Sequence, residues 1–274
     1  MPYLQRSGAK IWCDTEGEGS PLLLIQGLGY PSDASWRVLP ALAAQHTVIL
    51  LDNRGTGRSD VPEKPWIIAD MARDAAVAIE AAGMGPAHVA GFSMGGLIAQ
   101  ELALTRPDLV RSLTLGCTSP GGKDAVPMRQ KVAQQFVDWG NLSAEKAAWQ
   151  AAKVCYAETT PHEEIQADIA VRMQVPTSRR GYAGQMAAIG KYHGAGNRLW
   201  MWRRPVLVVH GSLDLIVPVE NVQVLTQRLS HVEVRVVHGA GHILMTDATD
   251  ELVETMLAHT ARVDSGTVDA KVAL

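Results

Sequence analysis

The sequence contains one stretch that constrains the fold more than any other, Gly91-Phe92-Ser93-Met94-Gly95-Gly96. A short apolar segment (87–90) precedes it, and a run of good helix formers (97–104) follows it. A serine at the apex of a sharp strand-to-helix turn, with glycine two positions before and after it, is the pattern of a nucleophile elbow. The plainer interpretation is a glycine-rich connection without a chemical role, and the strand–turn–helix context favours the elbow over it.

Short apolar runs alternate with helix-like segments along most of the chain. Continuous apolar runs suit strands that are buried on both faces, and their alternation with helices predicts parallel βαβ units. We therefore expect an α/β fold with a mostly parallel, doubly wound sheet. The expected strands lie within 2–16, where two flank a turn at 6–9, and at 22–25, 47–51, 87–90, 110–115, 205–211 and 232–237. The expected helices of this part are 36–44, capped by Asp33 or Ser35, and 68–82, 97–104, 218–229 and 247–261.

The pattern changes after residue 118. Four helix-like segments follow without an intervening strand, at 124–139, 143–157, 161–175 and 179–192. Such a series does not continue a βαβ pattern, so it predicts an inserted helical cap over the sheet. The expected organisation is a core of 1–118 and 204–262, a helical cap insertion of 119–203 and a flexible tail of 263–274.

A serine hydroxyl is a weak nucleophile and needs a neighbouring base, most often a histidine oriented by a carboxylate. His242 lies in the glycine-containing loop that follows the last expected strand, which makes it the favoured base. His238 closes that strand and is the weaker candidate. His193, in the cap, is a candidate substrate contact, although a solvated histidine is the plainer reading.

Asp214 is the favoured carboxylate because it follows a buried strand at the carboxyl end of the sheet, where ligands bind in open α/β sheets. The catalytic order along the chain is then Ser93, Asp214 and His242. Asp52 also ends a strand, but we expect it to hold the glycine- and arginine-rich loop that it opens. Asp247 is expected to cap the last helix.

A tetrahedral intermediate requires two hydrogen-bond donors for its oxyanion. The backbone N–H of Met94, the residue after the serine, is the first expected donor. The second is expected from the turn Gln26-Gly27-Leu28-Gly29, most plausibly the N–H of Leu28.

Charge and cysteine usage exclude several classes of partner. The net charge of −3 comes without a basic stripe, which argues against nucleic acid and anionic membranes as partners. No apolar run reaches the roughly 18 residues of a membrane span, and the N-terminus lacks the apolar core of a signal peptide. The three cysteines show no metal-ligand or disulfide spacing. We expect a cytoplasmic protein with no metal and no cofactor, and the sequence leaves a homo-dimer open.

These motifs resemble the α/β-hydrolase fold, and within it the cap-bearing esterases, enol-lactonases, carbon–carbon hydrolases and cofactor-free haloperoxidases. The resemblance covers residues from about 10 to 260 and is strongest, at 52–60 and 97–101, to bacterial enol-lactonase-like hydrolases. It implies a serine hydrolase without a cofactor. Serine rather than aspartate at position 93 speaks against epoxide hydrolases and haloalkane dehalogenases. Gln26 departs from the family, which usually has histidine there.

The expected function is cleavage of a carboxylic ester or lactone of a neutral, fairly hydrophobic small molecule through an acyl-enzyme. The cap is rich in aromatic residues and methionine, and we expect Trp139 and Met186 to contact the substrate. Two roles are open for Gln26: it braces the oxyanion turn, which is the favoured role, or it contacts the substrate directly. One alternative is the same triad used for C–C bond hydrolysis, acyl transfer or cyclisation. Another is a non-catalytic member of the fold that binds a small molecule.

Overall fold

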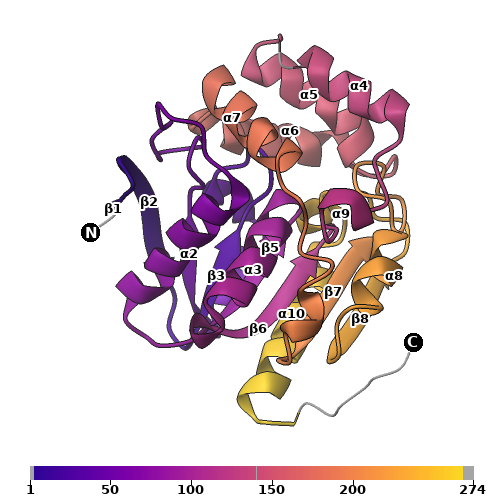
Figure 1. The fold of residues 1–274 in the computed structure, drawn as a ribbon. Helices are drawn as coiled ribbons and strands as arrows, with labels where there is room; N and C mark the ends of the chain where they lie inside the picture. Colours follow the sequence, from indigo (N-terminus) through magenta and orange to yellow (C-terminus); the bar gives the residue numbers. More distant parts are fainter. Residues whose placement is uncertain (1–2, 140, 268–274) are drawn as a thin grey trace.

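A computed structural model describes residues 3–139 and 141–267 of the chain (Figure 1). Within them one eight-stranded sheet has the order β1-β2-β4-β3-β5-β6-β7-β8. The strands are β1 (Tyr3–Arg6), β2 (Ala9–Glu16), β3 (Ser20–Ile25), β4 (His46–Leu51), β5 (Ala87–Phe92), β6 (Val110–Gly116), β7 (Val206–Gly211) and β8 (Val232–Val237). β1 and β2 pair antiparallel to their neighbours, and β4, β3, β5, β6, β7 and β8 run parallel. The expected mostly parallel α/β fold is thereby confirmed.

Helices cover both faces of the sheet. α2 (Ile68–Ala82), α3 (Met94–Thr105) and α8 (Asn221–Thr226) contribute to the hydrophobic core of one face. α1 (Leu39–Ala43), α9 (Leu244–Asp247) and α10 (Thr249–Asp264) contribute to the core of the other. The strands β3 to β7 bury nearly every side chain, as in β5, where all residues are buried. This double cover explains why the central strands read as continuous apolar runs rather than as alternating patterns.

Four helices lie in sequence between β6 and β7, and Figure 1 shows them gathered beyond one end of the sheet. They are α4 (Gln130–Trp139), α5 (Ala144–Cys155), α6 (His162–Gln174) and α7 (Arg179–Gly190). β6 and β7 are direct neighbours in the sheet, with Leu113 paired to Val206. The four helices therefore leave and rejoin the sheet without interrupting it.

Several elements differ from those expected. The helix expected at 36–44 is shorter: a 3-10 turn (Ser32–Ser35) precedes α1, whose N-cap Val38 makes no side-chain cap bond, so neither Asp33 nor Ser35 caps it. The helix expected from 124 begins at Gln130, after a 3-10 turn at Gly122–Asp124. Of the tail expected at 263–274, residues 263–264 belong to α10 and residues 268–274 lie outside the described residues.

No helix among the described residues combines the length and apolar character that a membrane crossing requires.

His88 on β5 gives the fold a built-in acid sensitivity. Its ring is 1 % exposed, with Nδ1 2.7 Å from Ser112 Oγ and Nε2 3.0 Å from the Asp264 carboxylate. Burial lowers the pKa of His88 to about 4, although Asp264 acts in the opposite direction. The unfolded chain, with a histidine pKa near 6.5, binds the proton first as the pH falls. The stability contributed by neutral His88 is therefore present above pH 6.5 and is lost between pH 6.5 and 4.

We expect the titration of His88 alone to make the free energy of unfolding about 2 kcal/mol smaller at pH 5 than at pH 7. Urea unfolding at the two pH values measures this difference, and His88→Gln, which cannot titrate, should show a correspondingly smaller loss. An equal loss in the variant would show that another group is responsible.

Candidate active site

Ser93 occupies a strained turn between β5 and α3. The strand ends at Phe92 and the helix begins at Met94, so a single residue makes the turn. Its backbone has φ 55° and ψ −120°, a region that residues other than glycine rarely adopt. The Ser93 N–H donates to Gly116 O at 2.9 Å, and Thr118 Oγ1 donates to Ser93 O at 2.7 Å. Bonds to Gly116 at the end of β6 and to Thr118 just after it thus hold the serine in this conformation.

Close backbone packing explains the glycines around Ser93. A Cβ at Gly95 would lie 2.1 Å from Ile25 O, and a Cβ at Gly91 would lie 2.2 Å from Gly95 O. Neither neighbour is a flexible side chain that can move away. Glycine at these two positions is therefore what allows α3 to start directly against β3 and β5.

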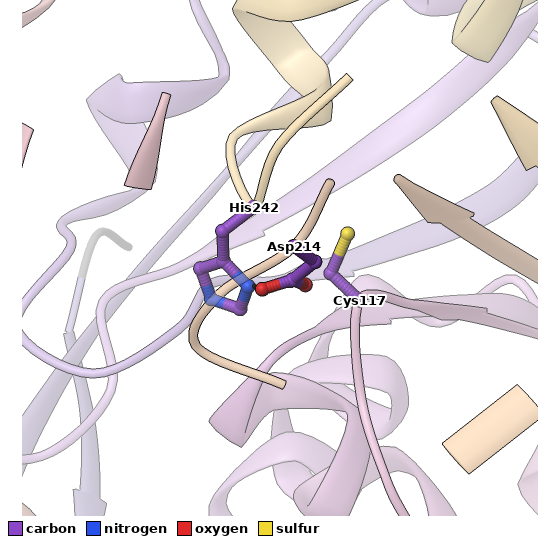
Figure 2. Close-up of side chains that lie close together, drawn as sticks. All are labelled: Cys117, Asp214 and His242. Carbon is purple, nitrogen blue, oxygen red and sulfur yellow. Dashed lines mark hydrogen bonds and ion pairs between the residues drawn. The ribbon is translucent and has the colours of Figure 1, made fainter. Parts of the chain in front are cut away.

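Asp214 and His242 meet at the carboxyl ends of β7 and β8, as Figure 2 shows. His242 Nδ1 lies 2.8 Å from Asp214 Oδ2. Asp214 Oδ1 accepts from the N–H groups of Ile216 and Val217 at 2.8 and 2.9 Å, which fixes the carboxylate in its loop. A carboxylate only accepts hydrogen bonds, so the proton of the neutral ring lies on Nδ1, and Nε2 has a lone pair with which to take up a proton.

A second histidine, His210 on β7, also contacts Asp214. Its Nε2 lies 3.3 Å from Asp214 Oδ2 and 2.9 Å from Val217 O. Both neighbours are acceptors, so this nitrogen carries the ring proton. Burial raises the pKa of the Asp214 carboxyl, but His242 and His210 outweigh burial and hold that pKa well below its usual range. The carboxylate is therefore ionised at neutral pH. His210 is not among the residues that the sequence predicts for the site; its place four residues before Asp214, at the end of a buried strand, is the available signal.

Cys117 completes a compact group with Asp214 and His242 in Figure 2, with one potential ligand atom of each within 4.8 Å of the others. This donor set does not fit a metal ion. Both Asp214 oxygens already accept hydrogen bonds, and His242 presents its protonated Nδ1 to them. Burial raises the pKa of the Cys117 thiol well above its usual value, so no thiolate is available.

The loop that carries His242 is tied to the end of α5. The N–H groups of His242 and Ile243 both donate to Cys155 O, at 2.7 and 3.1 Å. Asp247 Oδ2 accepts from the N–H groups of Gly241 and Ala157 at 2.7 and 3.0 Å. The expectation that Asp247 caps the last helix is wrong, because α10 begins at Thr249 after Ala248 without a side-chain cap bond. Its bonds across the chain to Gly241 and Ala157 were not visible from sequence spacing.

The turn after β3 contains Leu28, whose N–H is the second donor expected for an oxyanion. A Cβ on Gly27 would lie 3.2 Å from Ser93 Cβ, so this turn passes directly beside the serine. Within the described residues, neither Leu28 N–H nor Met94 N–H donates a hydrogen bond, and both residues line the same cavity as Ser93. The turn is held from α7, where Gln185 Oε1 accepts from Gly29 N–H at 2.8 Å. Two unpaired N–H groups beside a serine are what an oxyanion hole requires.

Gln26 is 4 % exposed, and both its side chain and its backbone carbonyl are hydrogen-bonded. Its Nε2 donates to Ser35 Oγ at 2.6 Å and lies 3.7 Å from Met245 Sδ. Its backbone carbonyl accepts from Asn53 Nδ2 at 3.0 Å. Gln26 is also one of the residues that line the cavity, and its side-chain bond to Ser35 holds it beside the turn.

A cavity of about 760 Å³ lies between these loops and the helices α4–α7. Ser93 and His242 line it, and so do Trp139 of α4 and Met186 of α7. His238 and His193, the two weaker candidates, are exposed and do not line it. Asp52 is fully buried and accepts from Arg58 in its own loop and from Ser32 in the 3-10 turn after β3, which accords with a structural role.

Known proteins share this architecture. A family model described as the alpha/beta hydrolase fold matches residues 20–249. Esterase EaEST from Exiguobacterium antarcticum has a TM-score of 0.84 at 21 % identity, over 94 % of this chain and 98 % of that one. The enol-lactonase from Burkholderia xenovorans LB400 also has a TM-score of 0.84 at 21 % identity, over 95 % and 100 % of the two chains. At this identity the structural likeness shows a shared fold.

Two relatives are closer in sequence. A poly(3-hydroxyalkanoate) depolymerase from Ectopseudomonas oleovorans is 26 % identical over 238 residues, which are 84 % of this chain and 80 % of that protein. A putative carbamate hydrolase RutD from Azorhizobium caulinodans is 47 % identical over 116 residues. That match spans 42 % of this chain and 43 % of the relative, less than half of its length. Since the family model covers most of the sequence and the solved structures share its architecture, the chain belongs to the α/β-hydrolase fold family.

Proposed function

We propose that the protein is a serine hydrolase that cleaves a carboxylic ester or lactone through an acyl-enzyme. The observation that carries this proposal is the 2.8 Å contact between His242 Nδ1 and Asp214 Oδ2, at the wall of the cavity that Ser93 also lines. In this proposal Ser93 is the nucleophile, His242 the general base and Asp214 the group that orients it. The hydrolase names of the relatives support the reaction class.

In the proposed reaction Ser93 Oγ attacks the carbonyl carbon and its proton passes to His242 Nε2. The carbonyl oxygen becomes an oxyanion that accepts from the N–H groups of Leu28 and Met94. Collapse of this intermediate breaks the bond to the alcohol, which leaves with the proton from His242. Water then repeats the sequence on the acyl-enzyme, releasing the acid and restoring Ser93.

The lining of the cavity supports a fairly hydrophobic small molecule as the substrate. Apolar and aromatic side chains from α4 to α7 form much of its wall, including the proposed contacts Trp139 and Met186. Apolar walls with a few placed polar groups are usual for small-molecule sites. We accordingly propose residues 119–203 as a cap that selects the substrate, on a core of 1–118 and 204–262. Gln26 then acts as a brace of the oxyanion turn.

The first test is hydrolysis of p-nitrophenyl esters and lactones in water enriched in ¹⁸O. We expect one ¹⁸O atom in the carboxylate product, and we expect Ser93→Ala to lose at least about 10³-fold in turnover because the covalent route is removed. The matched control is Ser119→Ala, which changes another serine that lines the cavity. Hydrolysis that survives in Ser93→Ala would contradict the proposal, and acyl transfer without ¹⁸O incorporation would favour the alternative use of the triad.

The second test concerns His210 as a positioning residue. His210→Phe removes the Nε2–H that faces Asp214 Oδ2 while keeping a ring of similar size. Losing one hydrogen bond to a buried charge should lower kcat/KM by about 10- to 100-fold, less than the ~10⁴-fold loss expected of Asp214→Asn.

The same substitution at the exposed His238 is the control, and circular dichroism verifies the fold of each variant. Removal of His210 also removes a group that lowers the pKa of Asp214, so the pKa of this carboxyl should rise in the variant, which an NMR titration of ¹³C-labelled aspartate measures. Activity of His210→Phe within two-fold of wild type, with an unchanged pKa of Asp214, would leave His210 a packing residue only.

A further inference from the structure

The wall of the cavity carries two buried or half-buried charged side chains from α6, Asp168 and Arg172. Asp168 is fully engaged. Its Oδ1 accepts from Trp36 Nε1 at 3.0 Å and Arg37 Nε at 2.9 Å. Its Oδ2 accepts from Tyr156 OH at 3.1 Å and also from Thr246 Oγ1. The acid therefore has no remaining role as a counter-ion for Arg172.

Arg172 lies one helical turn after Asp168 and is unpaired. Within the described residues its guanidinium forms no ion pair and donates no hydrogen bond, and its Nε is buried without a partner. Its guanidinium carbon lies over the Tyr30 ring, 3.7 Å from the ring centroid. Buried charges are normally paired, because removing an ion from water without compensation is unfavourable. An unpaired cation on a cavity wall therefore points to a ligand that brings the negative charge.

The position of Tyr30 connects this cation to the proposed chemistry. Tyr30 N–H donates to Gly27 O at 3.3 Å, so the tyrosine closes the turn whose Gly27 lies beside Ser93. The surroundings are apolar: burial raises the pKa of Tyr30 to about 12, even though the charge of Arg172 lowers it. In such surroundings an ion pair is weakly screened, so a charged group of the substrate meets a strong and directional partner.

We propose that the substrate carries a carboxylate on its acyl part, away from the bond that is cleaved, and that Arg172 binds this carboxylate. The inference rests on the proposed ester or lactone hydrolysis and refines its substrate class from a neutral molecule to a half-ester of a dicarboxylic acid or the equivalent lactone. A carboxylate fits because a planar guanidinium binds its two oxygens side by side. Arg172 and Ser93 line the same cavity, and the many apolar side chains of its wall suit an intervening hydrocarbon chain.

Two matched esters test the proposal. The first is the mono-p-nitrophenyl ester of adipic acid, and the second carries a carboxamide in place of the free carboxylate. We expect wild-type kcat/KM to favour the carboxylate at least about tenfold, mainly through KM, since a hydrogen bond to a charged group is worth that much or more. Arg172→Met should abolish the preference, and Arg172→Lys should restore part of it.

Arg179→Met is the control for the general effect of positive charge. Arg179 also lines the cavity, but it is exposed and its Nη2 donates to Asn141 O at 3.0 Å. Its removal should leave the preference between the two esters unchanged. Equal rates of wild type on the two esters, or an equal fall of both rates in Arg172→Met, would overturn the proposal and leave Arg172 a structural partner of Tyr30.

Binding of adipate itself separates this proposal from the hydrolytic one. Calorimetry should show adipate binding to the wild type at least tenfold more tightly than to Arg172→Met, whether or not any ester is cleaved. Ester cleavage without this difference in binding would contradict only the proposed carboxylate site and would leave the proposed hydrolysis standing. Binding with the difference, but without cleavage of any ester, would support the site and contradict the proposed hydrolysis.

Discussion

The turn at Ser93 is the constraint on which the rest of the site depends. α3 begins one residue after β5 ends, and Gly95 packs so closely on Ile25 O that a side chain there would overlap it. This contact sets the distance between the elbow and the turn after β3, and hence where the N–H groups of Leu28 and Met94 lie relative to Ser93. The strained backbone of Ser93 is stabilised by hydrogen bonds to Gly116, at the end of β6, and to Thr118, just after it. The geometry of the site is therefore fixed by the same contacts that pack α3 on the sheet.

The helices between β6 and β7 contribute to the positions of the other groups as well as to the cavity wall. Cys155 at the end of α5 accepts from the backbone of His242, and Gln185 of α7 accepts from Gly29 in the turn after β3. Gln185 also donates to Arg54 O and Thr56 Oγ1, at 3.0 and 2.6 Å, and so connects the turn to the loop after β4. A change in these helices is therefore expected to act on the geometry of the site and not only on substrate choice.

Much of the fold could be predicted because the strands are apolar runs bounded by glycine or polar residues, and because the elbow motif has one structural context. The proximity of Asp214 and His242 follows from their places after strands whose carboxyl ends share one edge. The contacts of His210 and Asp247, and the place of Arg172 on the cavity wall, could not be predicted in this way. Each depends on a partner distant in sequence or on the orientation of a side chain. The spacing of residues along the sequence indicates neither of these. Arg172 illustrates the difference: in the sequence it is one of many basic residues, and only the packing of α6 brings it into an apolar cavity.

The proposed role of Ser93 as nucleophile requires that it form a covalent acyl-enzyme with an activated ester. The most direct measurement is peptide mass spectrometry of the Asp214→Asn variant, mixed with a p-nitrophenyl ester and quenched in acid within one turnover. Slow deacylation in this variant should leave the acyl group on the peptide that contains Ser93, with a mass increase equal to the acyl group minus one hydrogen. Release of p-nitrophenol without any acylated peptide, or acylation confined to a different residue, would contradict the role of Ser93 as the nucleophile.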